Sequence, residues 1–120
     1  MHQINKLSLL LEVITTQSQA RLVNLKLDCT ANTREAIASA REGRLYFKVI
    51  IGGNVRYFVR KADGIIFAAA GRAAPCFNRS FGTLDTINDF HWGNYEPIAN
   101  ANTPWRMVPT RRGYMTAVAV

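Results

Sequence analysis

The first part of the chain predicts a helix from the spacing of its apolar residues. Apolar residues recur three or four positions apart, at Ile4, Leu7, Leu11 and Ile14. This period places them on one face of a helix over residues 3–17. Residues 21–28 alternate apolar and polar positions as a half-buried strand does. A helix is the alternative there, because Leu and Lys are tolerated in both states.

A second helix is predicted from a capping signal. Asn32 can act as its N-cap, and Glu35 follows three residues later as in a capping box. The alanine-rich stretch 34–42 continues the helix, and Gly43 ends it. The small side chains of this helix would allow it to pack closely on a sheet.

The middle of the chain predicts an antiparallel meander over residues 44–70. Three runs rich in β-branched and aromatic residues lie at 44–51, 55–61 and 65–70. The segments that separate them, Gly52-Gly53-Asn54 and Ala62-Asp63-Gly64, suit hairpin loops of three residues.

The length of these loops determines which side chains share a face. Three-residue loops predict that the first hairpin pairs Phe47 with Val59, Val49 with Tyr57, and Ile51 with Val55. The face built in this way is almost wholly apolar, and the two helices are expected to cover it. The second loop adds to this face Ile65, Phe67 and Ala69. It leaves on the opposite face a small apolar strip of Ile66, Ala68 and Ala70.

The C-terminal third predicts little regular structure. Residues 71–82 form an irregular segment in which Phe77 and Phe81 are expected to be exposed. An aromatic-rich loop over 91–109 would wrap around the domain, and residues 110–120 would form a terminal strand or a flexible arm. The predicted fold class is therefore α+β, a single domain of 120 residues with a three- to four-stranded antiparallel sheet packed on two N-terminal helices.

Basic residues are concentrated in the predicted sheet and in the tail. The net charge is +7, and a hydrophobic content of 48% is typical of a globular protein. Residues 44–82 hold seven basic residues and one acidic residue, and residues 105–120 hold three arginines and no acid. Arginine outnumbers lysine by 11 to 4, which suits bidentate phosphate contacts, although a genome rich in G and C would produce the same excess.

The polar face of the predicted sheet interleaves cations with aromatic rings. Such a face offers stacking surfaces to bases and positive charge to phosphates. The predicted nucleic-acid contacts are Tyr46, Lys48, Arg56, Phe58, Arg60, Arg79, Arg111 and Arg112. We therefore expect a small non-enzymatic protein that binds nucleic acid, DNA or RNA, with low sequence preference and with single strands favoured over duplexes.

Docking on a protein is the alternative function. Tyr and Arg side chains also dominate protein interfaces. The chain would then be an inhibitor or accessory protein of the phage or mobile-element type, or it would associate with a second copy of itself. Exposed sheet faces also carry such residues without any binding role.

Candidate catalytic chemistry is confined to three residues. A short helix expected over residues 84–90 would place Asp85 and Asp89 on one face, with His91 just beyond its end. Two carboxylates and an imidazole can move protons or hold a divalent metal. A structural role is the simpler interpretation, so no catalytic residue, metal or cofactor is predicted.

The remaining chemical signals are sparse. Cys29 and Cys76 lack the spacing of a metal site and are expected to be free thiols. The longest apolar run has six residues, 65–70, and the N-terminus lacks the pattern of a secretion signal. A cytoplasmic protein without membrane contact is the resulting expectation.

Overall fold

The computed structural model describes residues 2–94 and 96–120 of the chain. Its helices are α1 (His2–Asn24), α2 (Thr30–Glu35) and the 3-10 helix η1 (Ile87–Asp89). The main sheet is antiparallel and follows chain order, with strands β1 (Ala38–Glu42), β2 (Tyr46–Ile51), β3 (Asn54–Arg60), β4 (Ile65–Ala69) and β5 (Pro75–Thr83). Two small sheets pair β6 (Phe90–His91) with β7 (Ile98–Ala99), and β8 (Trp105–Pro109) with β9 (Met115–Ala119). The α+β class is confirmed, with five strands in the main sheet.

Helix α1 is longer than the predicted one and includes much of the ambiguous segment 21–28. The strand interpretation of that segment is wrong, and the helical alternative holds as far as Asn24. Val23, Leu25 and Leu27 are exposed, so their alternation with polar residues does not mark a half-buried strand. The helix ends where Lys26 adopts a left-handed conformation with φ 58°.

The predicted helix over 34–42 is wrong beyond Glu35, because Ala38–Glu42 forms strand β1. Ala38 and Ala40 pair with residues of β2, and the Ala38 N–H donates to the Thr15 hydroxyl of α1 at 2.9 Å. These long-range contacts outweigh the helix propensity of alanine. Asn32 does not cap a helix, since its side-chain amide donates to the Leu27 carbonyl.

The meander is confirmed, and its first hairpin has the predicted pairs Phe47 with Val59 and Val49 with Tyr57. Ile51 pairs with Asn54 instead of Val55, because Gly52 and Gly53 form a two-residue turn with positive φ angles. A β-bulge restores the register further along the strands. Ile50 pairs with Val55 and Val49 with Tyr57, so Arg56 is the extra residue.

The second hairpin differs from the prediction by one residue, because its loop has four residues instead of three. Val59 pairs with Ile66, and Tyr57 pairs with Ala68. The Gly64 N–H closes this loop by donating to the Arg60 carbonyl at 2.7 Å. Ile66 and Ala68 therefore face the core, and Phe67 lies on the opposite face.

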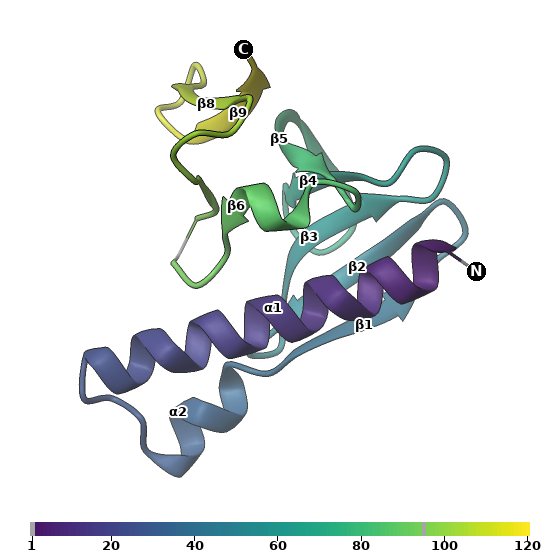
Figure 1. Ribbon diagram of the computed structural model, residues 1–120. Helices are drawn as coiled ribbons and strands as arrows, with labels where there is room; N and C mark the ends of the chain where they lie inside the picture. Colours follow the sequence, from purple (N-terminus) through teal and green to yellow (C-terminus); the bar gives the residue numbers. More distant parts are fainter. Residues whose placement is uncertain (1, 95) are drawn as a thin grey trace.

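One hydrophobic core draws side chains from α1 through to β9. Leu7, Leu10 and Ile14 of α1 pack on the sheet face that holds Val49 and Val59. Figure 1 shows α1 lying across the sheet, with the β8–β9 hairpin at the far end of the molecule from α2. Helix α2 contributes no buried residue, so only one of the two helices covers the sheet.

The C-terminal third is more regular than predicted. Trp92 is buried, and its indole N–H donates to the Ile87 carbonyl at 2.9 Å. Residues 115–119 form β9, and Ala117 of this strand belongs to the core, so the tail is a strand and not a flexible arm. None of the helices in the described parts of the chain combines the length and hydropathy needed to span a membrane.

Candidate nucleic-acid interface

Four aromatic side chains cross the main sheet on the face opposite the core. This aromatic stripe consists of Tyr46, Phe58, Phe67 and Phe77, one each from β2, β3, β4 and β5. The Tyr46 and Phe58 rings meet edge to face with centroids 5.8 Å apart, and the Phe67 and Phe77 rings do so at 5.3 Å. Phe58 and Phe67 are direct cross-strand partners, which makes the stripe continuous. None of the four is part of the hydrophobic cluster that packs against α1.

The stripe has a buried centre and accessible ends. Phe58 is 1% exposed and Phe67 is 6% exposed, because neighbouring side chains cover them. The prediction that Phe58 offers its ring to a base is therefore wrong. Phe77 is 61% exposed and Tyr46 is half-buried, so these two rings can stack with a ligand. Phe81 was also expected to be exposed, but it lies in the core.

Cationic groups lie above the buried centre of the stripe. The Lys48 ammonium is 5.8 Å from the Phe58 ring centroid, and the Arg60 guanidinium is 5.1 Å from that of Phe67. Their stems shield the rings while their charged ends reach solvent. Arg41, the exposed cross-strand partner of Lys48, adds a third cation to this face.

The charge of Arg60 is partly balanced by Asp63. The Arg60 guanidinium donates to both Asp63 carboxylate oxygens, with the shortest contact at 2.7 Å. These hydrogen bonds raise the pKa of Arg60 above its ordinary value and lower the pKa of Asp63. Arg60 lies on the predicted face but can offer only part of its charge to a phosphate.

A basic groove of about 450 Å³ is lined in part by β5, the strand that carries Phe77. It separates β5 from the β8–β9 turn and is lined by Cys76, Asn78, Arg79, Thr110, Arg111, Arg112 and Tyr114. Among the described residues, this lining contains three arginines and no carboxylate. Phe77 lies between Cys76 and Asn78 in β5 but is not part of the groove lining, so β5 carries the end of the stripe and one wall of the groove.

Arg111 and Arg112 are held on a tight turn. The Thr110 N–H donates to the Tyr114 carbonyl at 2.7 Å, and the Gly113 N–H donates to the Thr110 carbonyl at 2.9 Å. Gly113 has φ +85°, a conformation that other residues rarely adopt. The turn presents both arginines to solvent, as a phosphate-binding role requires.

Arg79 connects three segments and does not serve as an open phosphate ligand, which corrects the prediction. Its Nε donates to the Met115 carbonyl at 3.0 Å, and an Nη2 contact of 2.5 Å joins it to the Glu96 carboxylate. Its guanidinium also lies 5.0 Å from the Tyr114 ring centroid. With its side chain 16% exposed, Arg79 mainly fixes the wall of the basic groove.

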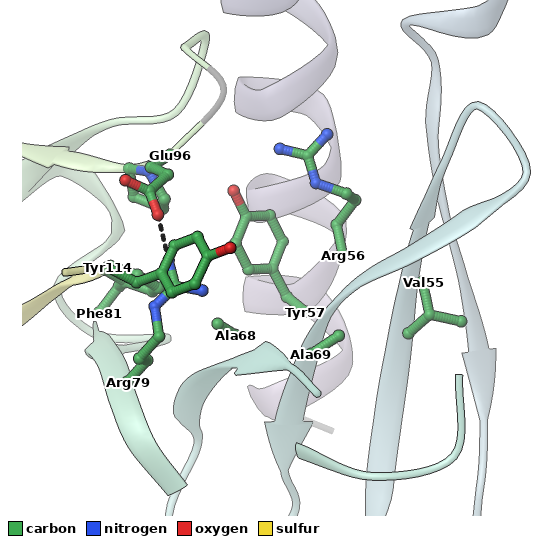
Figure 2. Close-up of a pocket in the computed structure, with 10 residues that line it drawn as sticks. Val55, Arg56, Tyr57, Ala68, Ala69, Arg79, Phe81, Glu96 and Tyr114 are labelled. Atoms are coloured by element: carbon green, nitrogen blue, oxygen red, sulfur yellow. Dashed lines mark hydrogen bonds and ion pairs between the residues drawn. The ribbon is translucent and has the colours of Figure 1, made fainter. Parts of the chain in front are cut away.

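Arg56 lies away from the predicted face. As the extra residue of the β-bulge, it follows the orientation of Tyr57 instead of alternating with it, and its guanidinium is 6.0 Å from the Tyr57 ring centroid. Figure 2 shows Arg56 and Tyr57 together in a cleft in front of α1. The sequence could not reveal this, because a bulge shifts the alternation without a local signal.

The candidate catalytic residues do not form a common site. The predicted helix over 84–90 is replaced by a turn followed by the three-residue 3-10 helix η1. Asp85 pairs with Lys6, and Asp89 accepts a hydrogen bond from the Trp105 indole at 3.0 Å. His91 lies in β6. Within residues 2–94 and 96–120, no three His, Cys, Asp or Glu side chains are grouped to hold a metal.

Both cysteines are free thiols, as predicted, with Cys29 exposed and Cys76 half-buried in the groove wall. Comparison of the chain with protein-family models, with curated proteins and with solved structures found no match. Function is therefore inferred from the residues and their geometry.

Proposed function

We propose that this protein is a non-enzymatic single-stranded nucleic-acid-binding protein with low sequence preference. The observation that supports this most directly is the position of Phe77. Its exposed ring ends the aromatic stripe on β5, and β5 also lines a groove whose described residues include three arginines and no carboxylate. Exposed rings combined with cations are the means by which such proteins stack bases and neutralise phosphates.

The strand would lie across the sheet, from Tyr46 to the basic groove. Bases stack on the accessible rings of Tyr46 and Phe77, while phosphates are contacted by Arg41, Lys48, Arg111 and Arg112. Phe58 and Phe67 form the rigid floor that fixes the spacing of the outer rings. A duplex keeps its bases stacked on one another and cannot use these rings, so single strands are preferred.

The number of phosphate contacts predicts how strongly the affinity should depend on salt concentration. Four phosphate contacts, made by Arg41, Lys48, Arg111 and Arg112, give a slope of log K against log salt of about −3 for a single strand. Raising the salt four-fold, from about 50 to about 200 mM, should weaken binding by roughly 50-fold.

The test is fluorescence anisotropy of a labelled oligonucleotide, single-stranded and as its duplex, at both salt concentrations. We expect tighter binding of the single strand and a slope near −3. Arg111→Gln should make the slope shallower by about 0.7. Arg34→Gln removes the same charge from the exposed surface of α2 and should leave the slope nearly unchanged. Equal effects of both variants, or equal binding of both strand forms, would reject the proposal.

A second candidate function, docking on a protein, rests on a different observation. Val23, Leu25 and Leu27 are each at least 50% exposed where α1 ends and the chain turns toward α2. Exposed apolar side chains grouped in this way are typical of protein interfaces. A single partner recovered in a pull-down after nuclease treatment, and lost on Leu25→Ser, would support this function. Recovery of the same partner by Leu25→Ser would exclude this surface.

A further inference from the structure

A cleft lies on the core side of the sheet and shares Arg79 and Tyr114 with the basic groove. This Tyr57 cleft has a volume of about 140 Å³, and its lining includes residues of β3, β4 and β5 together with Glu96, Pro97 and Tyr114. Figure 2 shows the Tyr57 side chain in the cleft, with Arg56 on one side and the Arg79–Glu96 ion pair on the other.

The polar groups of the cleft are predominantly hydrogen-bond donors. Tyr57 is almost fully buried, and burial raises the pKa of its phenol to about 12, so the hydroxyl keeps its proton. The Arg56 guanidinium lies beside it. Of the lining residues that the structure describes, Glu96 alone carries a carboxylate, and Arg79 balances its charge at 2.5 Å. A ligand in this cleft therefore has to supply acceptors.

The remaining walls are apolar. They are formed by Val55, Ala68, Ala69, Phe81 and Pro97. A cavity of about 140 Å³ approaches the size that accommodates a benzene ring in a protein interior. Apolar walls around a few donors are the usual composition of a small-molecule site.

We propose that the Tyr57 cleft binds a small carboxylate with a compact hydrocarbon body, such as benzoate. Its oxygens would accept hydrogen bonds from the Tyr57 hydroxyl and the Arg56 guanidinium, and its body would contact the apolar walls. Phosphate offers the same acceptors without the hydrocarbon body, so it should bind more weakly.

The test is isothermal titration calorimetry of the full chain with benzoate, acetate and inorganic phosphate. We expect saturable binding with one site, tightest for benzoate. Tyr57→Phe keeps the buried ring and removes only the donor, so it should weaken benzoate binding by about ten-fold or more. Arg56→Gln should have a similar effect. Arg34→Gln removes the same charge from the exposed surface of α2 and should change the affinity for benzoate by less than about two-fold.

Three results would overturn the proposal: no saturable binding of benzoate, equal losses in Arg56→Gln and Arg34→Gln, or unchanged binding by Tyr57→Phe. If Arg56→Gln does not fold, as judged by circular dichroism, Tyr57→Phe alone carries the test. Because the cleft and the aromatic stripe use different faces of β3, Tyr57→Phe should bind oligonucleotides like the parent protein. Either proposal can thus fail without the other.

Discussion

Two Phe→Ala variants should show that the buried ring of the aromatic stripe stabilises the fold, whereas the exposed ring binds nucleic acid. Phe58→Ala removes a ring that is 1% exposed, a change that typically costs about 3 kcal/mol or more. Phe77→Ala removes a ring of which only about two-fifths is covered, since it is 61% exposed. At about 2–3 kcal/mol for full burial of a Phe side chain, the expected cost is about 1 kcal/mol.

The same two variants should have the opposite order of effect on binding. Loss of a base stack on Phe77 costs about 1–3 kcal/mol, which corresponds to a 5- to 150-fold weaker complex. Phe58→Ala, studied under conditions where it is folded, removes no stacking surface and should weaken binding less. Urea unfolding followed by tryptophan fluorescence gives the stabilities, and anisotropy gives the affinities.

Parallel losses of stability and affinity in the two variants would refute this division of the stripe. A Phe77→Ala variant that binds like the parent protein would refute it too, because the exposed end of the stripe then contributes nothing to binding. Tyr46→Phe serves as the control for stacking, since it keeps the ring and should change the affinity by no more than about 0.5 kcal/mol.

Three further predictions concern charge, backbone and pH. Asp63→Asn removes the carboxylate that pairs with Arg60. The affinity for an oligonucleotide should therefore rise, and the slope of log K against log salt should steepen by about 0.7. An unchanged slope would show that Arg60 makes no phosphate contact. Gly82→Ala should destabilise the protein by about 2 kcal/mol or more in urea unfolding. The reasons are that φ of this residue is +67° and that the new Cβ would lie 2.2 Å from the Thr86 hydroxyl. A variant with the stability of the parent protein would contradict this prediction. The Tyr57 phenol has a pKa raised from 10.0 to about 12, so the stability it contributes is present below pH 10 and lost as the pH rises toward 12. The free energy of unfolding, measured over this pH range, should decrease, and the decrease should be smaller in Tyr57→Phe.

Local signals allowed the sequence to predict the meander and the polar face of β2. Gly52 and Gly53 specify a turn by their own conformational freedom, and alternation then places Tyr46 and Lys48 on one face. The α+β class followed from these signals together with the helical period near the N-terminus.

The errors arose where contacts distant in sequence decide the structure. Ala38–Glu42 is a strand because β2 offers a partner and Thr15 caps its first N–H. The β3–β4 loop has four residues instead of the predicted three, and this shift of register by one residue places Phe67 on the outer face. Phe67 thereby joins Phe58 to Phe77 in the aromatic stripe, which the predicted register does not contain. No local pattern indicates the bulge that turns Arg56 away from this face.

Photochemical cross-linking of a thymidine-rich single strand, with the attached peptides mapped by mass spectrometry, would locate the bound strand on the protein. The proposed path across the sheet predicts cross-links at Tyr46 and Phe77, at the two accessible ends of the stripe, and their loss when unlabelled single strand competes. Cross-links confined to α1 and α2, or a pattern unaffected by competitor, would contradict it.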